Sequence, residues 1–317
     1  MPKVTIIGVG DVGATIAYTL QMSGLATELV LIDAEPAKAQ GNAMDMNHGL
    51  FFTPPVTIRA GDYADAAGSQ VIIITAGARQ RPGETRLELT RRNADICRSI
   101  LDRLAPHLGD AKVLMIANPV DAMTYLAIQR SGLPPPRVFG SGTVLDSARF
   151  RYELSRTCGV DPRNVHAYVV GEHGDSEVFL WSQVHIAGTP LEAFCCGCGR
   201  QCPPDGKADI ERSVRNSAYH VIEKKGFTSY AVSLAVLRII GAILRDERSV
   251  LTVSTLLQGQ YGLDGVCLSV PCIVGAGGIE RIVHTTLSPF EREALGRSAE
   301  VIRSAIASVL APHPAQG

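Results

Sequence analysis

One of the eight histidines of the chain stands in a sequence suited to acid/base chemistry. His173 lies in the segment Gly-Glu-His-Gly-Asp at residues 171–175, directly after an expected strand at 165–170. The flanking glycines allow a ligand to approach closely, whereas most histidines only fill a core or a surface. Since an imidazole titrates near neutral pH, His173 is a candidate to exchange a proton with a substrate oxygen.

A carboxylate and a guanidinium stand three residues apart in an expected helix at 146–158. This spacing places Asp146 and Arg149 on one helix face. A carboxylate beside an imidazole fixes its tautomer and favours its charged form, and a planar guanidinium binds a substrate carboxylate with two hydrogen bonds. The alternative is a simple ion pair within the helix, which stabilises by only about a few tenths of a kcal/mol.

A glycine-rich turn, Gly-Val-Gly-Asp-Val-Gly, follows the first expected strand and opens a helix. Gly8 permits the tight turn, Gly10 lets the backbone approach a pyrophosphate, and Gly13 lets the helix pack closely on the strand. The start of the helix then presents N–H groups to the phosphates.

Asp33 ends the second expected strand, 20 residues beyond Gly13. An acid at this position accepts hydrogen bonds from ribose hydroxyls and repels a 2′-phosphate, so it predicts NAD rather than NADP. The alternative for Asp33 is a solvated turn residue.

The elements that must position these residues alternate in type through the first half of the chain. The short β-branched runs are apolar on both faces, as parallel strands covered by helices are. They lie at residues 4–7, 28–32, 71–75, 112–117 and 138–139. This alternation predicts a doubly wound parallel Rossmann sheet, an α/β fold, in an NAD-binding domain at residues 1–140.

The pattern changes after about residue 140, and residues 141–317 are expected to form an α+β substrate-binding catalytic domain. Helical patterns cover 146–158, 210–225 and 289–310. Strand-like runs cover 165–170 and 184–187, and runs at 250–257 and 266–274 are expected to pair antiparallel.

The composition excludes several classes of function. With 30 basic and 31 acidic residues, a nucleic-acid-binding protein is not indicated. No apolar run is long enough to span a membrane, and no secretory signal precedes the first strand. The eight cysteines are therefore interpreted as thiols of a cytoplasmic protein.

Four motifs in this order and spacing resemble the L-lactate/malate dehydrogenase family, from residue 3 to about residue 310. They are the glycine turn, Asn-Pro-Val-Asp at 118–121, Leu-Asp-Ser-Ala-Arg at 145–149 and the histidine segment at 171–175. The resemblance implies that His173 exchanges the proton, Asp146 is its partner and Arg149 binds the substrate carboxylate. It also implies that Asn118 contacts the nicotinamide and the reacting atoms, and that Thr228 lies beside the substrate. The cofactor-binding residues expected on this basis are Gly8, Gly10, Val12, Gly13, Asp33, Gly77 and Asn118.

The segment 77–86 resembles the closing active-site loop of the family. There Arg86 would polarise the substrate carbonyl, and Gln80 occupies the position of an arginine that grips the second carboxylate in malate enzymes. An unpaired buried charge costs about 3–5 kcal/mol, so a neutral Gln80 favours pyruvate and lactate over oxaloacetate and malate. Arg81 would become the selector if the register were shifted by one residue, but the spacing from Gln80 to Arg86 argues against a shift.

Arg151 and His166 match positions that bind the activator fructose bisphosphate across a subunit interface in bacterial members of the family. Paired basic groups of two subunits form a phosphate site, and filling it relieves their mutual repulsion. Because the family is usually tetrameric, the resemblance also implies an allosteric homotetramer. The alternative is a surface arginine on a helix and a histidine on a strand.

Four cysteines in eight residues, at positions 195, 196, 198 and 202, depart from the family pattern. They could bind zinc, but their spacing is not one of the common paired forms, so a loop with incidental thiols and no metal is favoured. Two rivals to a pyruvate-specific enzyme stay open. One is a malate or other 2-hydroxy-acid dehydrogenase, and the other is a non-catalytic NAD-binding protein.

Overall fold

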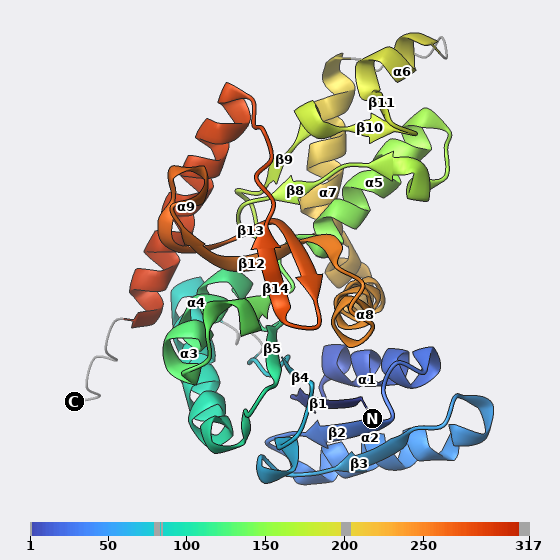
Figure 1. Cartoon of the computed structure of the whole chain (residues 1–317), viewed down its shortest axis with the longest axis vertical. Coiled ribbons are helices and arrows are strands. Elements are labelled where there is room, and N and C mark those ends of the chain that lie inside the picture. The colour runs from blue at the N-terminus through green and yellow to red at the C-terminus, as the bar shows by residue number, and fades with distance from the viewer. Residues whose placement is uncertain (1, 79–82, 84, 198–203, 311–317) are drawn as a thin grey trace.

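The computed structural model describes residues 2–78, 83, 85–197 and 204–310 (Figure 1). The α-helices of this part are α1 (Asp11–Ser23), α2 (Pro36–His48), α3 (Arg86–Leu104), α4 (Val120–Ser131), α5 (Val144–Cys158), α6 (Leu191–Gly197), α7 (Pro204–Lys225), α8 (Tyr230–Leu244) and α9 (Pro289–Leu310). None of these described helices is long and apolar enough to cross a membrane.

Among the described residues, nine strands form one sheet, in the spatial order β14-β13-β12-β6-β5-β4-β1-β2-β3. Six of them are parallel: β1 (Lys3–Ile7), β2 (Glu28–Ile32), β3 (Thr57–Ala60), β4 (Val71–Ile74), β5 (Lys112–Met115) and β6 (Val138–Gly140). The predicted doubly wound parallel sheet is confirmed. Because the strand order reverses between β1 and β4, the crevice for a ligand is expected at the carboxyl ends of these two strands.

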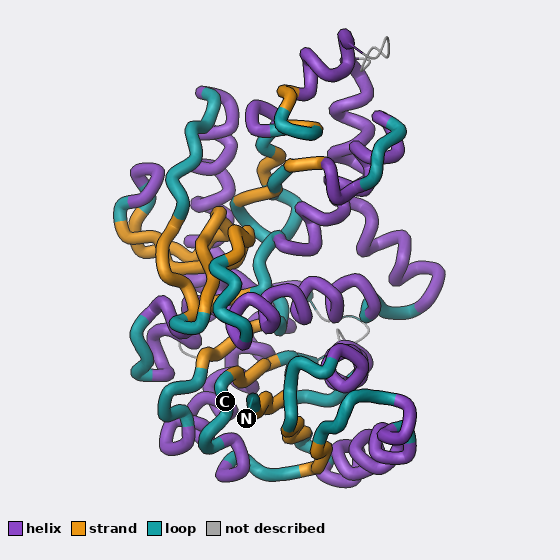
Figure 2. Tube along the Cα trace, turned by 45° about the vertical axis from the view of Figure 1, so that its right-hand side comes forward, coloured by secondary structure: helices purple, strands orange, loops and turns teal. Residues whose placement is uncertain are grey.

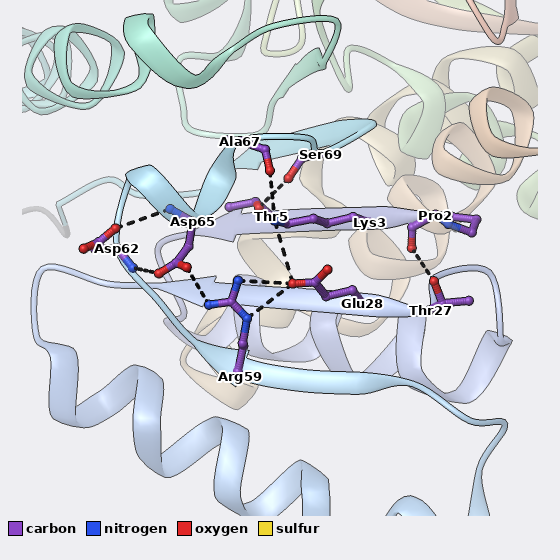
Figure 3. A network of polar contacts seen from close by, with 10 residues as sticks. All are labelled: Pro2, Lys3, Thr5, Thr27, Glu28, Arg59, Asp62, Asp65, Ala67 and Ser69. Carbon is purple, nitrogen blue, oxygen red and sulfur yellow. Dashed lines mark hydrogen bonds and ion pairs between the residues drawn. The ribbon is translucent and has the colours of Figure 1, made fainter.

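A polar network connects β1, β2 and β3, the last of which forms one edge of the sheet (Figure 3). Lys3 Nζ lies 3.7 Å from Glu28 Oε1, which also accepts a hydrogen bond from Arg59. Arg59 in turn contacts Asp65 at 2.7 Å. Lys3 and Glu28 are the first residues of β1 and β2, so their ion pair joins the amino ends of these two strands, away from the glycine turn at the carboxyl end of β1.

Three antiparallel strands of the second half extend the same sheet: β12 (Ser249–Gln258), β13 (Asp264–Gly275) and β14 (Gly278–Ile282). The predicted pair at 250–257 and 266–274 is observed as β12 and β13. Ser254 of β12 pairs with Gly140 of β6, so the sheet continues across the expected domain boundary at 140/141, and that boundary stays a prediction.

Smaller strands complete the second half: β7 (Val165–His166), β8 (Val169–Val170), β9 (Val178–Phe179), β10 (His185–Ile186) and β11 (Thr189–Pro190). The single strand expected at 165–170 is wrong, because β7 pairs with β10 and β8 pairs with β9 in another sheet. Figure 2 shows strands at the bottom, in the middle and, as short segments, in the upper part of the molecule, with helices around them.

Two apolar cores lie within the described part of the chain. The larger follows the nine-stranded sheet, where β4 is buried on both faces. The smaller lies under α5, where the Phe150 ring stands edge-on to Phe179 at 5.1 Å and to Trp181 at 4.8 Å. Helix α8 packs against α1 (Figure 1), so the second half is placed directly over the first.

Candidate active site

The loop that carries His173 joins β8 to β9, and these two strands lie between α5 and α9 (Figure 1). Gly171 begins the loop with a φ of +89°, and a Cβ there would stand 2.7 Å from Ser298 Oγ on α9. The next N–H, that of Glu172, donates to the same hydroxyl at 2.7 Å. Gly171 also exchanges backbone hydrogen bonds with Ser269 of β13. The loop is therefore fixed on both sides before it reaches His173.

Asp146 holds the imidazole of His173 through one ring nitrogen. The Nδ1 atom lies 2.6 Å from Asp146 Oδ2, and the carboxylate side chain is only 4% exposed. The His173 side chain is 28% exposed, so the ring is accessible to a small ligand. Because Nδ1 faces the carboxylate, Nε2 is the nitrogen that is left to exchange a proton with a substrate.

Arg149 shares the same carboxylate. Its Nη1 lies 2.9 Å from Asp146 Oδ1, one helical turn back along α5. The ion pair that was the alternative interpretation is therefore present, and it coexists with the contact to the imidazole. One buried carboxylate thus orients both the imidazole and the guanidinium.

The charges of this cluster reinforce one another. Burial alone would raise the pKa of Asp146, but the nearby His173 and Arg149 outweigh it and hold that pKa below its ordinary value. The negative charge of Asp146, in turn, raises the pKa of His173 to about 9, against an opposing effect of burial. Near neutral pH the imidazole is therefore positively charged and holds a transferable proton.

Glu177 is a neighbour of this cluster that the sequence did not point to. It is buried, and its Oε1 has no hydrogen-bond partner within the described part of the chain. Burial, followed by the charge of Asp146, raises the pKa of Glu177 to about 8. When ionised, Glu177 contributes to the raised pKa of His173.

Asp121 is a second residue that was missed, although it ends the quoted motif at 118–121. Its Oδ2 accepts the backbone N–H of His173 at 2.8 Å, and its Oδ1 accepts the Ser254 hydroxyl at 2.6 Å. Burial raises the pKa of Asp121 to about 6, although both hydrogen bonds act to lower it. No pattern near Asp121 indicates these partners, which lie far away in the sequence.

The glycine turn has the shape that a dinucleotide requires. A Cβ on Gly8 would stand 2.6 Å from Ala76, and one on Gly13 would stand 1.9 Å from the Gly8 carbonyl oxygen. Space opens beside Gly10, where the nearest atom to a built Cβ is Lys38 Nζ at 4.0 Å. Gly10 also begins α1 without a side-chain cap, so a pyrophosphate fits against the start of this helix.

Asp33 lies where β2 ends and supports the glycine turn. Its Oδ2 accepts the Val9 N–H at 2.7 Å, and its Oδ1 accepts the Glu35 N–H at 3.0 Å. An ionised carboxylate has about four acceptor positions, so both oxygens retain capacity for ribose hydroxyls. Of the other expected cofactor residues, Val12 is half-buried in the first turn of α1 and Gly77 is exposed after β4.

The structure describes some, but not all, of the other residues that are expected to bind the substrate. Asn118 is exposed before α4, and its carbonyl accepts a hydrogen bond from Asn93 at 3.0 Å. Thr228 is half-buried between α7 and α8, and within the described chain no hydrogen bond joins it to His173. Arg86 is the first residue of α3, but its side chain, like Gln80 and Arg81, lies outside the described residues.

The two residues of the expected regulatory site are near each other. Arg151 donates from Nε to the Ala167 carbonyl at 2.9 Å, and its guanidinium lies 5.1 Å from the centre of the Tyr168 ring. His166, exposed in β7, directly precedes Ala167.

The cysteine segment is described only in part. Cys195 is buried and Cys196 is exposed on α6, whereas Cys198 and Cys202 lie outside the described residues. Among the residues that the structure does describe, no group of three or more histidine, cysteine or acidic side chains could hold a metal ion.

Two family models match the chain, and together they cover most of it. Residues 2–140 match the NAD-binding domain of lactate/malate dehydrogenases, and residues 143–312 match the alpha/beta C-terminal domain of the same family. The expected NAD cofactor is thereby confirmed.

Curated relatives and solved structures agree with this match. The chain is 54% identical over 306 residues to an L-lactate dehydrogenase of Thermoanaerobacter pseudethanolicus, covering 96% of this chain and 98% of the relative. It is 51% identical over 305 residues to that of Acetivibrio thermocellus, covering 96% of each. Among structures, the minor L-lactate dehydrogenase of Enterococcus mundtii superposes with a TM-score of 0.95 at 38% identity, covering 98% of this chain and 99% of that one. A lactate dehydrogenase from a deep-sea metagenome of the Medee basin also gives a TM-score of 0.95 at 38% identity, covering 97% and 98%.

Proposed function

The chain belongs to the lactate/malate dehydrogenase family, and on that premise we propose that it catalyses the reversible reduction of pyruvate to L-lactate with NADH. The observation that carries the reaction type is the 2.6 Å contact between His173 Nδ1 and Asp146 Oδ2. It supports an acid/base pair in which a buried carboxylate keeps an accessible imidazole charged at neutral pH. The substrate follows from Gln80 and from the relatives, which are named L-lactate dehydrogenases.

In the proposed mechanism His173 moves the proton. NAD(H), when bound, supplies or accepts the hydride at the substrate carbon. Protonated His173 donates from Nε2 to the carbonyl oxygen of pyruvate, and neutral His173 accepts the hydroxyl proton of lactate in the reverse direction. Asp146 keeps the imidazole in the orientation and charge state that reduction needs.

Arg149 and the loop at 77–86 would place the substrate. Arg149 contacts Asp146 through Nη1, and the other N–H groups of its planar fork suit a substrate carboxylate. Arg86 would stabilise the developing negative charge on the oxygen as the loop closes and excludes water. Asn118 and Thr228 would line the space between the carboxylate and the nicotinamide.

Gly8, Gly10, Val12, Gly13 and Gly77 would hold the cofactor against the carboxyl ends of β1 and β4. The open space beside Gly10 and the uncapped start of α1 support a pyrophosphate there. Asp33 would bind the ribose hydroxyls, which favours NAD over NADP because a 2′-phosphate would meet its negative charge.

A substrate panel tests this proposal. The purified chain is assayed with NADH or NADPH against pyruvate, oxaloacetate and a bulkier 2-keto acid. With neutral Gln80, kcat/KM for pyruvate should exceed that for oxaloacetate by about two to three powers of ten. The opposite preference would identify a malate dehydrogenase. NADH binding without any turnover would identify a non-catalytic NAD-binding protein.

We further propose a homotetramer that fructose bisphosphate activates through Arg151 and His166. The support is the position of both residues beside Ala167, where two basic groups of one subunit would face those of another. The test is the dependence of rate on pyruvate with and without the sugar bisphosphate, in a sample shown to be tetrameric by light scattering. Activation should be lost in Arg151→Gln and kept in Arg163→Ala, because Arg163 is exposed and paired with Asp161. Absence of activation at low pyruvate in the wild-type tetramer would contradict the proposal.

A further inference from the structure

The Asp121 carboxylate connects three segments that are distant in the sequence. It lies in the first turn of α4 and is 1% exposed. One oxygen accepts the backbone N–H of His173 at 2.8 Å, and the other accepts the Ser254 hydroxyl of β12 at 2.6 Å. Both oxygens of a fully buried carboxylate are thus used, one toward the histidine loop and the other toward the sheet.

Through Asp121, the backbone of His173 is attached to the end of α4 where the cofactor is expected to bind. Asn118, expected to contact the nicotinamide, lies three residues before Asp121, at the same end of α4. Asp146 fixes the imidazole ring from α5, whereas Asp121 fixes the main chain of the same residue from α4. A ring held only at Nδ1 could still shift together with its loop, and the second carboxylate opposes that shift.

We propose that Asp121 is a positioning residue for hydride transfer, which holds the His173 backbone at a set distance from the nicotinamide side of the site. The inference rests on the acid/base role proposed above for His173. Catalysis depends on such distances, since a displacement of about 1 Å at the reacting atoms can cost about a hundredfold in rate. The effect is expected on kcat, because Asp121 touches neither the substrate-binding Arg149 nor the glycine turn in the described structure.

Two substitutions separate positioning from charge. Asp121→Ala leaves the His173 N–H and the Ser254 hydroxyl without their acceptor. Asp121→Asn keeps the shape, because its amide oxygen can accept the His173 N–H while its amide nitrogen donates to the Ser254 hydroxyl. The asparagine variant is therefore expected to rescue the geometry without the negative charge.

Glu291 provides a matched control at the start of α9. It is also a buried carboxylate, and it accepts hydrogen bonds from Ser182 N–H, the Ser182 hydroxyl and Ser288 N–H. Glu291→Ala removes a comparable set of contacts from a position that the proposed mechanism does not use. Any loss that comes only from a weakened fold should appear in this variant too.

The experiment measures kcat, KM for pyruvate, NADH affinity by fluorescence, and the isotope effect on kcat with NADH deuterated at the transferred position. In Asp121→Ala we expect kcat per folded molecule to fall about 10- to 100-fold and the isotope effect to rise, since hydride transfer becomes the slow step. NADH affinity should stay within about threefold, and Asp121→Asn should recover most of the rate. Glu291→Ala should keep the wild-type kcat per folded molecule and the wild-type isotope effect.

Wild-type kcat and isotope effect in Asp121→Ala would overturn the inference, as would an Asp121→Asn variant no better than Asp121→Ala. If the alanine variant does not fold, Asp121→Ser replaces it with the same expectations, because its short side chain cannot reach both donors. Wild-type protein that binds NADH without turnover would remove the proposed function itself. An unimpaired Asp121→Ala beside an inactive His173→Asn would remove only this inference.

Discussion

Replacing Asp146 by asparagine removes the charge that keeps His173 protonated and preserves the size of the side chain. The carboxylate is 4% exposed and lies 2.6 Å from the imidazole. Its charge is the largest influence on His173 and raises the pKa of the imidazole to about 9, whereas burial acts in the opposite direction. In Asp146→Asn the His173 pKa should therefore fall toward its ordinary value of 6.5.

The size of the effect follows from these two values. A fall from about 9 to 6.5 corresponds to about 3 kcal/mol of net stabilisation of the charged over the neutral imidazole. At about pH 7.5 more than about nine tenths of the wild-type imidazole is protonated, against about one tenth in the variant. Pyruvate reduction uses the protonated form, so kcat/KM should drop about tenfold from protonation alone, before any loss of orientation.

The assay is kcat/KM for pyruvate from about pH 5 to about pH 10. Because the raised pKa favours the proton donor below it, wild-type activity should be full at neutral pH and be lost as pH rises through about 9. The variant should lose activity near pH 6.5 instead, and Asp161→Asn, at an exposed ion pair, should follow the wild type. If Asp146→Asn loses activity on the alkaline side within about half a pH unit of the wild type, this reasoning is refuted.

Three further substitutions test other parts of the structure. Asp33→Ser should raise kcat/KM with NADPH relative to NADH at least about tenfold, and an unchanged ratio would contradict the role of the carboxylate. Gly13→Ala places a Cβ 1.9 Å from a carbonyl oxygen of the turn, so NADH affinity measured by fluorescence should fall, whereas Gly41→Ala, with open space around it, should bind normally. Phe150→Ala, at a residue with no exposed surface, should lower the free energy of unfolding by about 3–5 kcal/mol in denaturant titration, and a loss below about 1 kcal/mol would speak against a close-packed second core.

The sequence predicted the parallel sheet because its strands carry a local signature. Runs such as Val71–Ile74 are apolar on both faces, and the glycine turn after β1 has fixed spacing. Helix α8 was not predicted, since Tyr230–Leu244 is apolar on nearly every side and lacks a clear polar face. The extension of the sheet by β12 was also missed, because pairing between Ser254 and Gly140 joins segments more than 100 residues apart.

Only those residues of the candidate site that lie in recognisable sequence motifs could be predicted. His173, Asp146 and Arg149 stand in recognisable segments, and the structure places the first and the last in contact with Asp146. Asp121 and Glu177 escaped because their importance depends on burial and on partners that no local pattern specifies: Asp121 meets His173 across 52 positions of the chain. Three points stay predictions. They are the role of Gln80, on which the choice of pyruvate depends, the roles of the individual site residues, and the cytoplasmic location.

A single-turnover measurement of NADH oxidation by pyruvate, in wild type and in His173→Asn, tests the acid/base role of His173 most directly. Asparagine cannot carry the proton, so the rate of hydride transfer should fall by about two powers of ten or more. NADH affinity, measured by fluorescence, should stay within about threefold, because the glycine turn and Asp33 are separate from the imidazole. A His173→Asn enzyme that oxidises NADH at the wild-type rate would contradict the proposed role of this histidine.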